Sequence, residues 1–234
     1  MSGPPDSDLL TMVLPRGRHA APRSVVSASQ RERLLAAMAA AVADKGYAHV
    51  AVADVIERAG VSRKTFYEHF ANKEQCFLAA YDAGITALLR SIDEAIAAAA
   101  PDWLEATAAG TRTYLQALAA NPDFARTFLV EVLAAGPAAL ERRAEVHQRF
   151  ADRLAATIRV ARRDLPGLPD LPDYVFRACV GAINELVTEQ LLRHGAESLP
   201  ALVTPILGVE LALLTGHELA AALSSARGAA SRRS

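Results

Sequence analysis

The 234-residue sequence has few of the residues that build covalent or metal-bound scaffolds. Its two cysteines, Cys76 and Cys179, do not form a spaced pair, and its six histidines do not form an H-x-x-x-H pattern. We therefore expect no metal site and no disulfide framework. A reducing, cytoplasmic setting fits this cysteine usage.

Long uninterrupted apolar runs are also scarce. The longest candidate, residues 199–216, contains Glu210, is interrupted by Pro200 and Pro205, and is barely long enough to cross a membrane. The start of the chain has Asp6 and Asp8 before any apolar run, unlike a secretory signal. We expect residues 199–216 to form a buried helix, and no membrane partner.

No arrangement of nucleophile, base and stabilising donors is recognisable, and neither is a metal cluster. The Asp and Glu residues are scattered over alanine-rich segments, which is typical of solvated helix faces. The sequence therefore predicts neither an enzyme nor a bound cofactor.

Alanine and leucine are abundant, and apolar residues make up 52% of the chain. Such a composition favours helices over sheets and provides enough apolar surface for a core. Proline and glycine fall at probable helix breaks, which are Pro101, Asn121-Pro122, Gly136-Pro137, the segment 166–172 and the segment 195–200. The expected fold is all-α.

Charge is divided unevenly along the chain, although the net charge is only −1. Residues 16–90 carry 11 Lys/Arg against 7 Asp/Glu, whereas residues 91–234 carry 14 Arg against 17 acidic residues. Local charge, not net charge, decides whether a surface can approach phosphate. Residues 16–90 are therefore the part of the chain that could bind nucleic acid.

Cap signals mark the helices of this first part. Residues 1–28 are rich in Pro, Ser, Gly and Arg and read as a flexible basic arm. Ser29 with Glu32 resembles a capping box for a first helix that ends near Gly46. Val52 to Gly60 reads as a short amphipathic second helix.

Two further caps follow the glycine turn at Gly60. Ser62 can cap a third helix from Arg63 to about Phe70, and Asn72 can cap a fourth. Short helix, turn and short helix are the elements of a helix-turn-helix. On the third helix, Phe66 and Phe70 share an apolar face, while Lys64 and Glu68 occupy the opposite one.

The segment G-V-S-R-K-T-F-Y-E-H-F-A-N-K-E, residues 60–74, resembles the DNA-binding segment of TetR-type (TetR/AcrR) transcriptional regulators. Gly46-Tyr47 and Asp54-Val55-Ile56 precede it in the same pattern. The resemblance covers about residues 30–80. It implies an N-terminal three-helix helix-turn-helix domain followed by a helical ligand-binding and dimerisation domain. The expected domain boundaries are 1–28 for the arm, 29–75 for the DNA-binding domain (motif about 52–71), 76–224 for the effector and dimerisation domain, and 225–234 for a flexible tail.

By position, the resemblance implies specific DNA contacts. Arg63 and Lys64 would read bases, because Arg and Lys donate to guanine O6 and N7. Glu68 would either accept from cytosine N4 or pair with Lys64 one turn earlier. The expected phosphate contacts are Ser62, Thr65, Tyr67, His69 and Lys73.

Two features of the sequence change how the DNA backbone is expected to be held. Family members often place Thr or Ser at the start of the second helix, where this chain has Val50 and Ala51. A phosphate there would have to be met by backbone N–H groups. Arg16 and Arg18 flank Gly17 as in an AT-hook, so the arm is either a minor-groove contact or a basic solubilising tail.

The rest of the chain supplies the other expected partners. Because one short reading head contacts few base pairs, specificity usually requires a dimer. The resemblance implies that the last two long helices, about 174–192 and 202–219, pair with their copies, although an intramolecular core is the alternative. It also implies an effector pocket for an unknown small molecule. The pocket candidates are Trp103, Phe128, Phe150 and Asn184, with Glu131, His147 and Glu185 as further polar groups.

The predicted function is a dimeric transcriptional regulator, a repressor released from a palindromic double-stranded DNA operator by a small-molecule effector. The alternative is an effector-independent architectural DNA-binding protein, which would use the basic arm and the first four helices.

Overall fold

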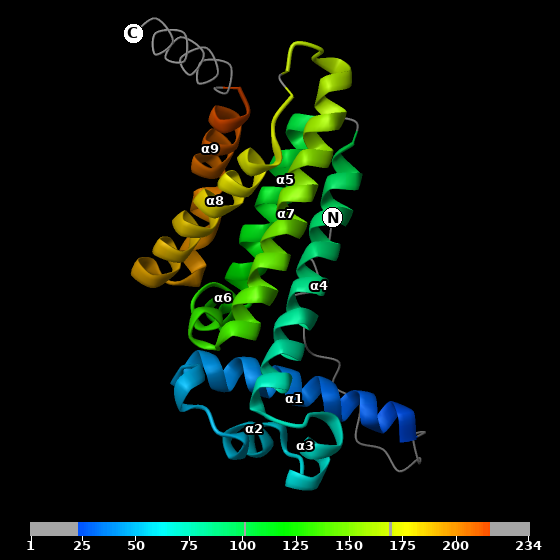
Figure 1. The fold of residues 1–234 in the computed structure, drawn as a ribbon, viewed down its shortest axis with the longest axis vertical. Coiled ribbons are helices and arrows are strands. Elements are labelled where there is room, and N and C mark those ends of the chain that lie inside the picture. Colours follow the sequence, from blue (N-terminus) through cyan, green and yellow to red (C-terminus); the bar gives the residue numbers. More distant parts are fainter. Residues whose placement is uncertain (1–22, 101, 169, 216–234) are drawn as a thin grey trace, which may run out of the picture.

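The computed structural model describes residues 23–100, 102–168 and 170–215, which contain helices and no strand (Figure 1). The α-helices are α1 (Arg23–Lys45), α2 (Val52–Ala59), α3 (Arg63–His69), α4 (Lys73–Ala99), α5 (Trp103–Ala120), α6 (Pro122–Leu129), α7 (Pro137–Asp164), α8 (Asp173–His194) and α9 (Val203–Thr215). Three short 3-10 helices are η1 (Tyr47–His49), η2 (Glu131–Ala134) and η3 (Ala196–Leu202). The expected all-α class is confirmed.

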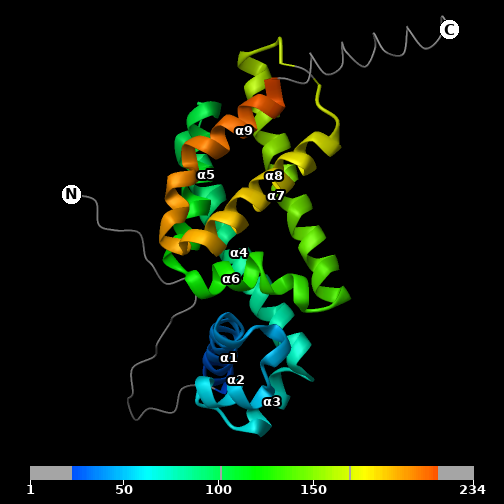
Figure 2. The ribbon, with the colours of Figure 1, turned by 90° about the vertical axis from the view of Figure 1, so that its left-hand side faces the viewer.

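Helices α1 to α3 form a small unit at one end of the molecule (Figures 1 and 2). Helix α4 starts in this unit, packs against α1, and continues into a bundle with α5 to α9. Helix α6 lies at the lower end of the bundle and contacts α1 directly. The two parts are thus joined both by the continuous α4 and by the contact between α6 and α1.

The predicted turn chemistry is largely present. Gly46 and Gly60, which follow α1 and α2, have φ angles of 77° and 60°, values at which a side chain would be strained. Asn72 caps α4 by accepting from the backbone N–H of Gln75 at 2.9 Å. The predicted breaks at Asn121-Pro122 and Gly136-Pro137 fall at helix junctions, where each proline is the first residue of the following helix, whereas Pro101 lies outside the described residues.

The first helix begins earlier than predicted. Helix α1 starts at Arg23, so Ser29 and Glu32 lie inside it and residues 23–28 are not part of the arm. No glycine or proline lies within α1, so nothing in the sequence ends the helix on the N-terminal side of Ser29. A capping residue permits a helix to start but does not require it. The arginines Arg16 and Arg18 and the tail 225–234 lie outside the described residues.

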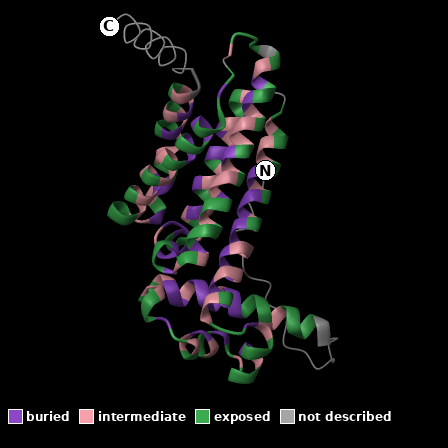
Figure 3. Cartoon of the chain, in the orientation of Figure 1, coloured by how far each residue is buried: buried purple, intermediate pink, exposed green. Residues whose placement is uncertain are grey.

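Buried side chains run along α4 and the part of α1 that packs against it (Figure 3). The C-terminal apolar segment behaves differently. Only 22% of the window Ala196–Leu213 is buried, although its mean hydropathy of 1.4 would suit a membrane span. A single helix of this kind is weak evidence for a membrane. The prediction of a buried helix here is wrong for the single chain, since most of this segment faces outward.

Candidate DNA-reading helix and ligand cavity

The turn between α2 and α3 is closed by local hydrogen bonds. The backbone N–H of Gly60 donates to the carbonyl of Glu57 at 3.2 Å, and that of Val61 donates to Ile56 at 3.1 Å. Ser62 then caps α3, because its Oγ accepts from the backbone N–H of Thr65 at 3.0 Å. This predicted cap is confirmed, and it sets the direction in which α3 leaves the turn.

Helix α3 has one buried and one exposed face, as the sequence predicts. Phe66 is fully buried and Phe70 is 5% exposed, with ring centroids 5.9 Å apart. Arg63 and Lys64 are exposed in the first turn. The Arg63 guanidinium lies 5.8 Å from the centroid of the exposed Tyr67 ring. The buried rings therefore hold α3 while its basic tip faces solvent.

Glu68 pairs with Lys64 in the free chain, with Lys64 Nζ 3.8 Å from Glu68 Oε1. Both side chains are well exposed, at 88% and 57%, so the pair is weak and can exchange for contacts with bases. Base reading by Arg63, Lys64 and Glu68 remains a prediction.

The side chains expected to contact phosphate differ in whether they already have partners within the chain. The Thr65 hydroxyl lies 2.9 Å from Ser62 Oγ, and His69 is half-buried beside Phe70. Lys73 donates to the carbonyl of Tyr47 at 2.9 Å and lies 4.2 Å from the centre of the Tyr47 ring. Its ammonium group is thereby held between α4 and η1. To contact a phosphate, Lys73 must either bind it in addition to the Tyr47 carbonyl or give up that carbonyl.

The start of α2 has no N-cap side-chain hydrogen bond and is held instead by Asp54. Asp54 accepts from the backbone N–H of Ala51 at 2.8 Å and from Lys45 at 2.6 Å. The hydrogen bond from Lys45, together with that from Ala51, lowers the pKa of the Asp54 carboxyl. The sequence analysis missed this role, although an acidic residue at the third position of a helix is a known signal.

The small unit and the bundle are joined by two hydrogen bonds from the α6–η2 segment. The Thr127 hydroxyl donates to the carbonyl of Ala39 in α1 at 3.3 Å. Glu131 Oε2 accepts from the backbone N–H of Tyr47 at 2.9 Å, and its Oε1 lies 3.5 Å from Arg126. Glu131, expected as a polar group of the pocket, does not line the cavity, because its carboxylate faces the α1–η1 turn.

A cavity of about 90 Å³ lies within the bundle, between α4, α5, α6, α7, α8 and α9. Its wall is mainly apolar. The large apolar residues are Ile92, Ile96, Tyr114, Phe128, Phe150, Leu154, Val180, Ile183 and Ile206. A mainly apolar wall with a few polar groups is typical of small-molecule sites.

Seven polar residues lie in the cavity wall: Thr107, Thr111, His147, Arg153, Thr157, Asn184 and Glu210. Glu210 on α9 is 3% exposed and accepts from the Thr111 hydroxyl at 3.3 Å. Burial lowers the pKa of His147 to about 4, with Arg143 adding to the shift, so the imidazole is neutral at neutral pH. Arg153 is held in a two-bond ion pair with Asp93 on α4, both bonds being 2.7 Å long.

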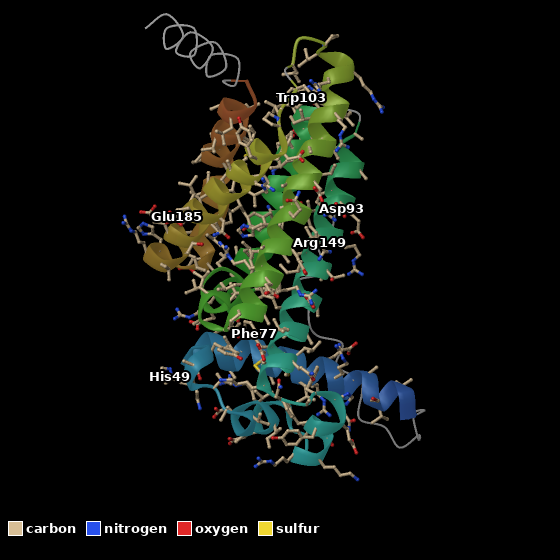
Figure 4. All side chains as sticks on the ribbon, in the orientation of Figure 1. His49, Phe77, Asp93, Trp103, Arg149 and Glu185 are labelled. Atoms are coloured by element: carbon tan, nitrogen blue, oxygen red, sulfur yellow. The ribbon has the colours of Figure 1, made fainter. Side chains whose placement is uncertain are left out.

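Three of the four predicted pocket residues, Phe128, Phe150 and Asn184, line this cavity, and Trp103 does not. Trp103 is the first residue of α5, near one end of the bundle (Figure 4), whereas the cavity starts one turn later, at Thr107. Glu185 is exposed on α8, next to Asn184 in sequence but outside the cavity wall.

Cys76 lies in the first turn of α4, a position at which a thiol pKa can be lowered. The thiol is fully buried, and burial raises its pKa to about 12. A thiol at that pKa carries little thiolate, so it is a poor nucleophile. Among the described residues, no group of three or more His, Cys, Asp or Glu side chains is arranged to hold a metal ion.

Comparisons with known proteins agree with these features. Residues 34–80, which span α1 to the first turns of α4, match the family model "Bacterial regulatory proteins, tetR family". The HTH-type transcriptional regulator EthR of Mycolicibacterium smegmatis is 29% identical over 173 residues, covering 73% of this chain and 77% of that protein. The fold is similar to those of two fatty-acid regulators. The fatty acid degradation regulator FadR of Bacillus halodurans has a TM-score of 0.71 at 21% identity, covering 80% of this chain and 95% of that one. FadR of Bacillus subtilis, in complex with stearoyl-CoA, has a TM-score of 0.69 at 19% identity, covering 79% and 97%. The matched helix-turn-helix segment and the curated relative support a TetR-type transcriptional regulator, and the solved structures share the fold.

Proposed function

We propose that the protein is a dimeric repressor that binds a palindromic operator through α3 and is released by an apolar small molecule in the bundle cavity. The observation that carries the proposal is the joint at α6. This helix contributes Phe128 to the cavity wall, and its neighbour Thr127 bonds α1 of the DNA-binding unit. One short helix therefore touches both the cavity and the reading head.

Dimerisation is supported by the outward faces of α8 and α9. Small residues are exposed on these faces, including Gly181 on α8 and Ala212 on α9, where two helices can approach closely. Leu192 on α8 is 58% exposed. Exposed apolar surface of this kind in a soluble chain usually marks an interface. Pairing of two copies would cover it and place two α3 helices on one DNA duplex.

Gly181→Arg should separate the dimer into monomers and weaken operator binding. A Cβ at Gly181 meets no atom within 4 Å in the single chain, so arginine fits the monomer but brings charge into the proposed interface. Light scattering measures the mass, and Ala156→Arg, at an exposed site on α7, is the control. A dimeric Gly181→Arg variant would place the interface elsewhere.

The proposed release follows from linkage. A ligand releases DNA only if it favours the state that binds DNA less well. Ligand entry would displace Phe128 and α6, and the bonds of Thr127 and Glu131 would pass this shift to α1 and η1. Lys73, which donates to Tyr47, extends the same contact to the start of α4. The spacing of the two α3 helices would then no longer fit the operator.

Glu131→Ala should weaken this coupling. The variant removes the acceptor of the Tyr47 N–H, so that amide should exchange its hydrogen faster. The ratio of operator affinities without and with ligand should fall by roughly 2- to 30-fold, the range of coupling changes of about 0.5–2 kcal/mol. Glu141→Gln, at an exposed site on α7, serves as the control. If the Tyr47 amide exchanges its hydrogen faster but the ratio of operator affinities without and with ligand is unchanged, Glu131 does not couple the cavity to DNA binding.

Sequencing of the DNA fragments that the purified protein selects, followed by footprinting, tests the proposed function. We expect a short palindrome with half-sites about one helical turn apart, or a multiple of it. Addition of long-chain acyl-CoA, the kind of ligand named for one FadR neighbour, and of other apolar compounds would then be screened for release. Uniform coverage of DNA without sequence preference would instead indicate an architectural protein. The regulator would act in the cytoplasm, where the bacterial chromosome lies.

A further inference from the structure

The carboxyl group of Glu210 is the most unusual polar group of the bundle cavity. It comes from α9, is 3% exposed, and is bonded by the Thr111 hydroxyl of α5 at 3.3 Å. Among the described residues, no Lys, Arg or His nitrogen lies within 4 Å of a Glu210 oxygen. A buried carboxylate without a cationic partner is costly, because burial penalises the charged form.

Glu131 shows how the same chain handles a buried carboxylate with a structural role. Its side chain is 11% exposed, and it has both a guanidinium at 3.5 Å and a backbone N–H at 2.9 Å. Glu210 has one hydroxyl instead. Burial raises the pKa of the Glu210 carboxyl to about 7, against a smaller lowering effect of Thr111. Near neutral pH the group is therefore poised to ionise when a positive charge approaches.

None of the basic side chains near the cavity is a cationic partner for Glu210. Arg153 lines the cavity, but its guanidinium is already held by both oxygens of Asp93. Arg143 lies one turn before His147 on α7 and is not part of the cavity wall. His147 is neutral, since burial lowers its pKa to about 4. The polar end of the cavity near α9 is therefore an acceptor site for a ligand.

We propose that the cavity selects ligands with an apolar body and a protonated amine, and that Glu210 receives the ammonium group. This deepens the proposed function, on which it rests, by naming the ligand class of the same cavity. The apolar wall buries the body of the ligand, and Glu210 with Thr111 orients its head. An ammonium–carboxylate contact in a water-poor site is a charge-assisted hydrogen bond, about twice as strong as a neutral one. A fatty acid of the same length would instead place a second carboxylate beside Glu210, and the two like charges would repel.

Calorimetric titration of the full-length protein at neutral pH tests the proposal with three ligands that share one chain length. These are decylamine, 1-decanol and decanoic acid. We expect decylamine to bind most tightly and decanoic acid most weakly. Glu210→Gln keeps the size of the side chain and removes its charge. It should weaken decylamine binding by about 10- to 100-fold, the effect of losing a hydrogen bond to a charged group, and change decanol binding by less than about threefold.

Glu141→Gln is the matched control, because it makes the same chemical change at an exposed carboxyl on α7 and should leave all three affinities unchanged. Thermal unfolding verifies that both variants fold. Should Glu210→Gln fail to fold, Thr111→Val tests the same head-group site and should reduce the preference for decylamine over decanol. Equal or tighter binding of decanoic acid, no binding of decylamine, or decylamine binding that ignores Glu210→Gln would each overturn the proposal.

Operator release, measured with the same ligands, separates this proposal from the proposed function. Release by decanoic acid or an acyl-CoA, without decylamine binding, would reject the amine and keep the regulator. If decylamine binds in a Glu210-dependent way but no apolar ligand releases DNA, the amine site is supported and ligand-controlled repression is rejected.

Discussion

Replacing both Arg63 and Lys64 by alanine should reduce specific DNA binding by at least about 1,000-fold, to the level of non-specific binding. Each lost base contact costs about 1–3 kcal/mol, and a dimer loses each contact twice. Both side chains are exposed in the first turn of α3, and the helix is held by the buried Phe66 and Phe70. The fold should therefore be unchanged. Fluorescence anisotropy with the selected operator and with random DNA measures the effect.

Arg159→Ala with Arg163→Ala is the control, since it removes the same charge from exposed positions of α7. It should change operator binding only slightly. Glu68→Ala separates two roles of that residue. A changed base preference at one operator position would show that Glu68 reads DNA, whereas an unchanged preference would leave it as the partner of Lys64. Specific binding retained by the Arg63–Lys64 variant would mean that another surface reads the operator.

Gly84→Ala should be strongly destabilising, although alanine normally favours helices. A Cβ at Gly84 would lie 2.1 Å from Cε2 of Phe124, an aromatic ring on α6 that is 4% exposed and stacked on Phe128. The ring cannot turn aside without disturbing Phe128. Overpacking of this kind costs about 1–3 kcal/mol or more, which exceeds the helix gain of about 1 kcal/mol. The midpoint temperature of thermal unfolding should fall by roughly 2–4 °C for each kcal/mol of stability that is lost.

Two further variants make this prediction specific. A Cβ at Gly110 would meet Cδ1 and Cγ1 of Ile96 at 3.2 Å and Cγ2 of Ile92 at 3.7 Å, so Gly110→Ala requires only a small shift of Ile96 and should be nearly neutral. Phe124→Leu in the Gly84→Ala background should recover part of the loss, so the two changes should not add. Since α6 also carries Thr127, the Gly84→Ala protein should show faster hydrogen exchange where α6 meets α1. Full stability of Gly84→Ala would mean that α4 and α6 can separate at little cost.

Local sequence signals predicted the DNA-binding unit well because its structure depends on neighbouring residues. Gly60 ends α2, Ser62 caps α3, and the four-residue spacing of Phe66 and Phe70 defines the buried face. The same logic failed at Ser29, because a capping pattern does not forbid a helix from starting earlier. It also missed Asp54, whose interaction with Lys45 depends on the path of the chain between α1 and α2.

Cavity residues were harder to predict, since they come from six helices far apart in sequence. Aromatic residues suggested Trp103, Phe128 and Phe150, but an aromatic residue on a helix is as consistent with the core or the surface as with a cavity. Glu210 was read only as an argument against a membrane helix. Its burial against Thr111 depends on a contact across 99 residues.

By itself, the sequence determined the all-α class, the helix breaks and the helix-turn-helix with Arg63 and Lys64 at its exposed tip. These features follow from caps, turns and periodicity within a few residues. Only the tertiary structure decided that Glu131 joins the two parts, that Glu210 faces the cavity, and that the apolar segment around α9 is mostly unburied in one chain. Those outcomes depend on how helices pack against one another, because packing decides which face of each helix water can reach.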